Sequence, residues 1–342
     1  MMIWQQGRRS ATRTLLHQQR RRASVRGREV MASPSRILLR TMSRATADAD
    51  RIGFIGLGNM GLPMCLNLAQ HKDVVAFDLN KDALQEAVAG GAQPAHNIQE
   101  VAAAGCSIIF TMLPGCQAVD AVILPLLQAS PNPSIFVDCS TVSPSTSRKW
   151  NEEAAKLNHT LVDAPVSGGV KGSRDATLTF MVGATEDSNA FHQVRPLLEL
   201  MGKRVISCGG PGTGAATKLC NNLALATQMI GICEALNLGE ELGVDPNTLT
   251  GVLNMSTAKC WSSEVNNPHP DVADGTPAFN DYRGGFGSKL MLKDLGLAVA
   301  AGEEVGVALP LGTTSKELYR LATLRGMGEK DFGVMLQFLR GK

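Results

Sequence analysis

One lysine stands alone in a long apolar stretch of the chain. Lys218 is the only Asp, Glu, Lys or Arg within residues 215–233, which consist mostly of Ala, Leu, Ile, Met, Thr and Asn. Burial lowers the pKa of a lysine, because the charged form loses its hydration. A lysine that is neutral near pH 7 can act as a general base. The stretch therefore predicts either a catalytic base or, equally, a lysine whose amine reaches solvent from the first turn of a helix.

An amide side chain follows this lysine at helical spacing. Asn222 comes four residues after Lys218, which places the two side chains on one face of a helix. An amide can hydrogen-bond a hydroxyl group without competing for its proton. The spacing predicts that Lys218 and Asn222 act together on one substrate hydroxyl.

A second set of residues has the composition of an anion-binding turn. The segment DAPVSGG (163–169) is a strand end that turns into glycines, and its last residues are Ser167, Gly168 and Gly169. Backbone N–H groups at such a turn, together with a serine hydroxyl, can hold a carboxylate. By itself, SGG also describes an ordinary loop. Lys293 and Asp294 are adjacent in an amphipathic stretch, and alone they predict surface charge on two faces of a helix.

A dinucleotide-binding pattern begins at residue 52. The strand 52–55 runs into a turn in which the first glycine permits tight bending, the second lets the backbone approach a pyrophosphate, and the third lets the next helix pack closely. The N-terminus of that helix offers N–H groups and a positive dipole. We expect the six residues of the turn to contact the cofactor: Gly56, Leu57, Gly58, Asn59, Met60 and Gly61.

The next strand ends in an acidic residue that selects the cofactor. A carboxylate at Asp78 can accept hydrogen bonds from both ribose hydroxyls and would repel a 2′-phosphate. NAD is therefore favoured over NADP. Ligands bind at the carboxyl ends of the strands in open α/β sheets, so Leu113, Pro114 and Thr141, which follow two further strands, are predicted to line the cofactor site.

The candidate site residues must be positioned by strands and helices. Short apolar runs alternate with helical patterns along the chain, and this alternation predicts where those elements lie. The predicted strands are 52–55, 74–78, 107–112, 135–138, 161–163 and 178–182. The predicted helices between them include 59–70, 82–89, 98–104, 117–127 and 144–157. Such alternation predicts an α/β fold, a Rossmann-type doubly wound parallel sheet with helices on both faces.

The pattern changes at the breaker cluster 209–214. A long apolar helix follows to about residue 242, and no further strand is predicted. Later helices are expected at 246–254, 288–301, 314–324 and 330–339, with a glycine-rich loop at 281–287. We therefore expect an NAD-binding domain at 51–211 and an all-helical C-terminal domain at 212–342.

The basic charge of the chain is confined to its first 50 residues. That segment holds eleven Arg and three acidic residues, a net charge of +8, so the remainder carries −6 of the total of +2. An Arg-rich, Ser-containing, acid-poor start is typical of a mitochondrial transit peptide, and we expect residues 1–50 to be one, without fixed structure. A basic arm that binds RNA or anionic lipid is the alternative, and Met31 could be a second start.

The remaining composition excludes several classes. An acidic body argues against nucleic-acid binding, and no run of about 20 apolar residues predicts membrane insertion. The eight cysteines show no C-x-x-C pair and no His at metal-ligand spacing, so no metal is expected.

Four ordered motifs resemble those of the β-hydroxyacid dehydrogenases. They are GFIGLGNMG (53–61), DAPVSGG (163–169), GTGAATKLCNN (212–222) and GGFGSKLMLKD (284–294), and the resemblance extends from about residue 51 to the end. The segments 247–264 and 331–340 resemble a mitochondrial member of that family. The resemblance implies NAD-dependent oxidation of a small β-hydroxy acid by a mitochondrial matrix enzyme that forms a homodimer or homotetramer. It also implies that the helical domain 212–342 is built on a long interdomain helix and serves substrate binding and oligomerisation.

The resemblance also implies roles for individual residues. Lys218 would be the catalytic base and Asn222 its partner, while Ser167, Gly168 and Gly169 would bind the substrate carboxylate. Lys293 would help to hold cofactor and substrate, with Asp294 beside it, and Trp261 would line the substrate pocket. Alternatives are reduction of tartronate semialdehyde, glyoxylate or succinate semialdehyde, or a non-catalytic NAD-binding module.

Overall fold

The computed structural model describes residues 51–272 and 274–341. The predicted transit peptide lies outside these residues. No helix of the described part is long and apolar enough to cross a membrane.

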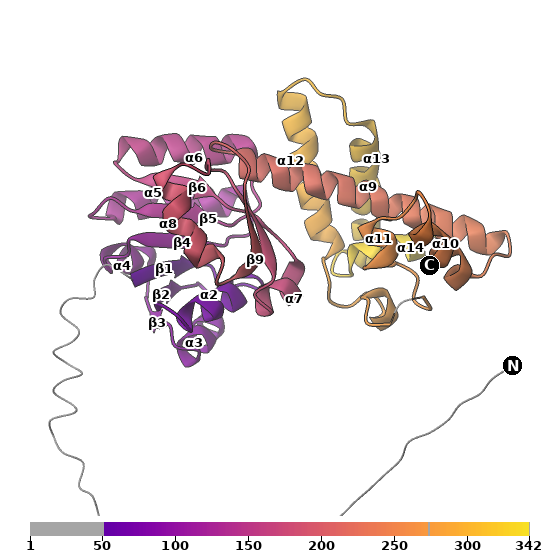
Figure 1. Cartoon of the computed structure of the whole chain (residues 1–342), viewed down its shortest axis with the longest axis horizontal. Helices are drawn as coiled ribbons and strands as arrows, with labels where there is room; N and C mark the ends of the chain where they lie inside the picture. Colours follow the sequence, from indigo (N-terminus) through magenta and orange to yellow (C-terminus); the bar gives the residue numbers. More distant parts are fainter. Residues whose placement is uncertain (1–50, 273, 342) are drawn as a thin grey trace, which may run out of the picture. The chain divides into compact units, whose positions relative to one another are not determined.

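A six-stranded parallel sheet forms the first half of the described chain (Figure 1). Its strands are β1 (Arg51–Ile55), β2 (Asp73–Phe77), β3 (Gln93–Pro94), β4 (Ile108–Thr111), β5 (Ile135–Asp138) and β6 (Thr160–Asp163), in the order β3-β2-β1-β4-β5-β6. The register aligns the strand ends, since Thr111 pairs with Asp138 and Asp138 with Asp163. The predicted doubly wound sheet is confirmed, and its polar strand ends meet at one edge.

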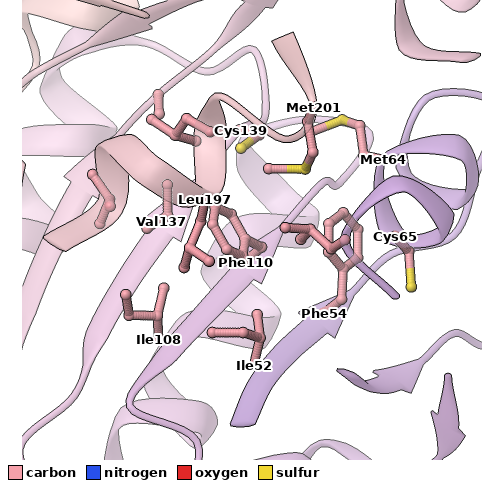
Figure 2. Close-up of a cluster of buried hydrophobic side chains, with 14 of the residues drawn as sticks. Ile52, Phe54, Met64, Cys65, Ile108, Phe110, Val137, Cys139, Leu197 and Met201 are labelled. Atoms are coloured by element: carbon pink, nitrogen blue, oxygen red, sulfur yellow. The ribbon is translucent and has the colours of Figure 1, made fainter. Parts of the chain in front are cut away.

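Helices cover both faces of this sheet because alternate strand residues point to opposite sides. The helices are α2 (Gly61–Ala69), α3 (Lys81–Ala89), α4 (Ile98–Ala103), α5 (Cys116–Ala129), α6 (Pro144–Lys156) and α8 (Asn189–Leu198). On β1, Ile52 and Phe54 pack with side chains of α2 and α8, as Figure 2 shows, whereas Ile55 packs with those of α4, α5 and α6. Each face is a separate buried apolar cluster, so the sheet is fixed from both sides.

A second, three-stranded sheet follows the first. It consists of β7 (Val166–Ser167), β8 (Leu178–Val182) and β9 (Gly202–Ser207), with α7 (Gly169–Arg174) between β7 and β8. The strand predicted at 178–182 exists, but it lies in this sheet, antiparallel to β7 and parallel to β9. We did not predict β9, because its exposed Lys203 and Arg204 interrupt the apolar pattern.

The described chain after Ser207 is helical apart from a single bridge between Gly287 and Asp331. The long helix α9 (Thr213–Glu241) is contacted by the helices that follow it (Figure 1). These are α10 (Pro246–Met255), α11 (Trp261–Glu264), α12 (Ser288–Glu304), α13 (Pro310–Ala322) and α14 (Met335–Leu339). The helix predicted at 330–339 starts later, since Asp331 forms the bridge and a 3₁₀ turn (Phe332–Val334) precedes α14.

A buried carboxylate fixes the loop that enters α12. Asp331 accepts hydrogen bonds from the N–H groups of Phe286 and Gly333 and from the amide of Asn266, at 2.8, 2.9 and 3.2 Å. Burial raises the pKa of Asp331. The glycine-rich loop 284–287 is thereby tied to the segment before α14.

Candidate active site

The glycine-rich turn after β1 has the geometry of a phosphate cradle. At Gly56, φ is +96° and an added Cβ would lie 2.3 Å from the carbonyl oxygen of Met112; at Gly61 it would lie 1.9 Å from that of Gly56. An added Cβ at Gly58, by contrast, meets nothing within 4 Å. Helix α2 follows this turn and begins without a side-chain cap. The turn therefore fits a dinucleotide pyrophosphate.

Asp78 lies directly beside this turn, as its motif predicts. Its Oδ2 accepts a hydrogen bond from the N–H of Leu57 at 2.5 Å, and its Oδ1 accepts one from Asn80 at 2.6 Å. A carboxylate has about four acceptor positions, so capacity remains for two ribose hydroxyls. Leu79, which follows, is fully exposed. The arrangement fits NAD, and the residues placed to hold it are the 56–61 turn and Asp78.

Two glycines of the turn should respond in opposite ways to alanine. We expect Gly61→Ala to destabilise the protein, because its Cβ would overlap the carbonyl oxygen of Gly56, with a thermal midpoint lower by several degrees. Gly58→Ala should keep the wild-type midpoint and weaken NADH binding about tenfold or more, because its methyl group would occupy the open cradle. Thermal unfolding and NADH fluorescence titration measure the two effects. Equal NADH affinity in Gly58→Ala and wild type would contradict the cradle.

Lys293 joins α12 to the predicted cofactor walls. Its Nζ donates hydrogen bonds to the carbonyl oxygens of Pro114 and Thr141, at 3.3 and 3.2 Å, and lies 3.4 Å from Oδ1 of Asp294. The expectation that Lys293 and Asp294 are surface charges on different faces is wrong: Asp294 is 2% exposed, and the Lys293 side chain both pairs with it and reaches the loops that follow β4 and β5. The structure thus brings Lys293, Pro114 and Thr141 together, with Leu113 beside Pro114.

Asn222 and Asp294 form a buried polar cluster with Lys218 as a close neighbour. The Nδ2 of Asn222 donates to Oδ2 of Asp294 at 2.6 Å, and its Oδ1 accepts from Asn221 at 3.0 Å. The Oδ1 of Asp294 has no hydrogen-bond partner among the described residues. Lys218 is 7% exposed and Asn222 is 2% exposed. The alternative in which Lys218 extends into solvent is therefore wrong.

Burial controls the protonation of Lys218. Its pKa is lowered from the ordinary lysine range, chiefly because desolvation disfavours the ammonium form. The carboxylate of Asp294 opposes this effect, and the ammonium of Lys293 adds to it. The shift is in the direction that a general base requires, because it makes the neutral amine easier to form.

The predicted anion-binding turn lies between β7 and α7. Ser167 is half-buried at the end of β7, Gly168 is the N-cap of α7 with a φ of +138°, and Gly169, the first residue of α7, has a φ of +62°. The hydroxyl of Ser173, in α7, donates to the carbonyl oxygen of Met60 at 2.7 Å. The turn is therefore held against the dinucleotide-binding turn, although no hydrogen bond among the described residues links Ser167 to Lys218.

Trp261 lies apart from the buried cluster of the other predicted site residues. The residue is 46% exposed, and its ring stacks on Phe332 at a centroid distance of 6.4 Å, while Phe286 meets Phe332 edge-on at 6.1 Å. No hydrogen bond or ring contact within the described chain joins it to Lys218 or Asn222. Its role in a substrate pocket stays a prediction.

Sequence reasoning missed two buried carboxylates at the strand ends. Asp138 accepts hydrogen bonds from the hydroxyl of Thr111 and the N–H of Ser140, and the Ser140 hydroxyl accepts from the N–H of Leu113. Burial raises the pKa of Asp138 and of Asp163. The sequence did contain a signal for these carboxylates, because each acidic residue ends a short strand with an apolar centre. A carboxylate at that position is buried and therefore needs hydrogen-bond partners. This network fixes the loops that carry Leu113 and Thr141.

Comparison with known proteins agrees with this geometry. Residues 51–210 match the model of the NAD binding domain of 6-phosphogluconate dehydrogenase, and residues 212–339 match that of the NAD-binding domain of NADP-dependent 3-hydroxyisobutyrate dehydrogenase. The mitochondrial 3-hydroxyisobutyrate dehydrogenase of Homo sapiens is 43% identical over 302 residues, covering 87% of this chain and 89% of its own. That of Drosophila melanogaster is 41% identical, covering 90% and 94%.

A solved structure shares the fold. The 3-hydroxyisobutyrate dehydrogenase of Mycobacterium tuberculosis, solved with L-serine, is 38% identical, with a TM-score of 0.81 over 85% of this chain and 99% of its own. Fold and site together define an NAD-binding oxidoreductase with a Rossmann domain followed by a helical region. The chain belongs to the β-hydroxyacid dehydrogenase family, and the similar proteins of Homo sapiens and Drosophila melanogaster are mitochondrial 3-hydroxyisobutyrate dehydrogenases.

Proposed function

We propose that this chain is an NAD-dependent 3-hydroxyisobutyrate dehydrogenase, which oxidises (S)-3-hydroxyisobutyrate to methylmalonate semialdehyde in valine catabolism. The observation that carries the proposal is the buried amine of Lys218 in a cluster with Asn222 and Asp294, on a chain 41–43% identical to enzymes of that name. L-serine, present in the M. tuberculosis structure, is itself a 3-hydroxy acid.

In the proposed reaction, separate residues bind the substrate carboxylate and transfer the hydroxyl proton. The N–H groups and hydroxyl of the turn 167–169 bind the substrate carboxylate, and this orients the other end of the molecule toward α9. Lys218 takes the proton of the terminal hydroxyl on its neutral Nζ, while Asn222, held by Asp294, orients that hydroxyl. Bound NAD supplies the acceptor for the hydride that leaves the carbinol carbon. In the reverse direction the ammonium of Lys218 returns the proton to the oxygen.

The pH dependence of the reaction should report Lys218. In the oxidation direction kcat/KM should rise with pH while Lys218 loses its proton, and then level off. Because burial lowers the pKa of Lys218, the midpoint should lie below the ordinary lysine value of about 10.4. Semialdehyde reduction needs the ammonium form, so its rate should fall as pH rises through the same midpoint. If the rise of kcat/KM with pH is centred at the unperturbed lysine pKa, the result would contradict a buried lysine as the base.

Turnover with the acid tests the function directly. Protein that starts at residue 51 is mixed with (S)-3-hydroxyisobutyrate and either NAD or NADP, and NADH or NADPH formation is followed by absorbance. We expect turnover with NAD. In the reverse direction, a higher kcat/KM for the NADH-dependent reduction of tartronate semialdehyde, glyoxylate or succinate semialdehyde than for that of methylmalonate semialdehyde would replace the substrate assignment. A protein that binds NADH but turns over none of these acids would be a non-catalytic NAD-binding module.

Location and assembly complete the proposal. The relatives are named as mitochondrial, which together with the basic first 50 residues supports import into the matrix. Large apolar side chains are exposed on the helices of the second half, among them Leu242, Met255 and Leu311, which are 72%, 85% and 71% exposed. They support a homodimer or homotetramer formed through this region, which light scattering coupled to size-exclusion chromatography would measure.

A further inference from the structure

Helix α9 receives its N-terminal cap from a distant residue. It begins after Gly212, whose φ is +81°, and no side chain at that position caps it. The N–H groups of Gly212 and Ala215 instead donate to Oδ1 and Oδ2 of Asp163, each at 2.8 Å. Asp163 ends β6 and is 2% exposed. One carboxylate thus satisfies two of the N–H groups that a helix start leaves unpaired.

The backbone packs tightly around this carboxylate. An added Cβ at Gly183 would lie 2.1 Å from Oδ1 of Asp163, and one at Gly214 would lie 2.2 Å from the carbonyl oxygen of Met181. The N–H of Gly183 also donates to the carbonyl oxygen of Asp163 at 2.7 Å. The end of β6, the end of β8 and the start of α9 are therefore in direct backbone contact around Asp163.

The same carboxylate joins the two segments that carry the proposed site, since it ends the strand before the turn 167–169 and bonds the start of α9. Lys218 lies three residues after Ala215, in the first turns of α9, and Ser167 lies four residues after Asp163. We propose that Asp163 is a positioning residue that sets the place of the Lys218 amine relative to the carboxylate-binding turn 167–169. This inference rests on the proposed function, because it takes the roles of Lys218 and the turn from there.

Asp163→Asn tests the inference with little change in shape. The amide has only one oxygen to accept the two N–H groups, and its own NH₂ would face the second of them. The first turn of α9 should then shift, and misplacement by about 1 Å can lower a rate about 100-fold. We expect kcat to fall 30- to 100-fold, the KM for the acid to rise, and NADH affinity to stay within twofold.

The pH profile separates positioning from loss of folded protein. Asp294 and Lys293, the charged groups that act on Lys218, are unchanged in the variant. If the amine moves toward water, the rising limb of kcat/KM should shift to higher pH. A smaller folded fraction would lower the apparent kcat and leave KM and the limb unchanged, and that result would overturn the inference, as would wild-type kinetics.

Two further variants complete the experiment. Ala215→Pro removes one donor to Asp163 in the first turn of α9. It should give a smaller drop in kcat with the same direction of pH shift if Asp163→Asn does not fold. Asp245→Asn is the matched control, because Asp245 caps α10 through the N–H of Thr248 and lies outside the site. Wild-type protein without turnover would instead overturn the proposed function.

Discussion

Replacement of Lys218 by methionine is expected to lower kcat on the order of 10⁴-fold, the upper end of what a general base contributes. Methionine retains the apolar stem in a site where the lysine is 7% exposed, and it removes only the group that accepts the proton. NADH affinity should stay within twofold of wild type, because the residues placed to hold NAD lie on other elements. Steady-state kinetics and NADH fluorescence titration measure the two quantities.

A matched lysine serves as the control for this variant. Lys156 is exposed near the end of α6 and forms an ion pair with Glu153, a surface pair of small energetic value. Lys156→Met should retain wild-type kcat and KM. If Lys218→Met keeps more than about a tenth of the wild-type kcat in the oxidation direction, Lys218 is not the base and the mechanism fails.

Asp78→Ser should change cofactor preference by about 100-fold or more. The carboxylate of Asp78 would repel a 2′-phosphate, and it also accepts the N–H groups of Leu57 and Asn80. The serine variant should therefore lose kcat/KM with NAD and gain it with NADP. The ratio of the two kcat/KM values, measured with the same acid, reports the change.

A neighbouring acid provides the comparison. Asp82, in the first turn of α3, is exposed and four residues away, so Asp82→Ser removes the same charge without contact to the turn 56–61. It should leave the NAD to NADP ratio within about threefold. An unchanged ratio in Asp78→Ser would show that the carboxylate does not select the cofactor.

The parts of the fold and site that could be predicted from the sequence are those formed by residues close together in the chain. The strand before Gly56, the glycines and the acid at Asp78 occupy one continuous segment, so their geometry follows from adjacency. Lys218 and Asn222 share a helical face because they are four residues apart. The same reasoning failed for β3 and β7, which are two residues long and carry no periodicity.

The convergence of distant side chains could not be predicted from local patterns. The hydrogen bonds of Lys293 to Pro114 and Thr141 cross 179 and 152 residues of sequence, and that of Asn222 to Asp294 crosses 72. Adjacent helical residues usually diverge, yet Lys293 and Asp294 converge because a long, flexible lysine reaches back toward its neighbour. Tertiary packing, which brings α12 against α9 and the sheet edge, determines these contacts.

The tie between Asp331 and the loop before α12 has a consequence for the order in which the protein becomes functional during synthesis. Chains emerge from the ribosome N-terminus first, and their N-terminal parts fold first. The turn 56–61 and Asp78 can therefore be assembled while the segment that fixes α12 has not yet been made. A nascent chain should acquire the capacity to bind dinucleotide well before it acquires the capacity to turn over substrate.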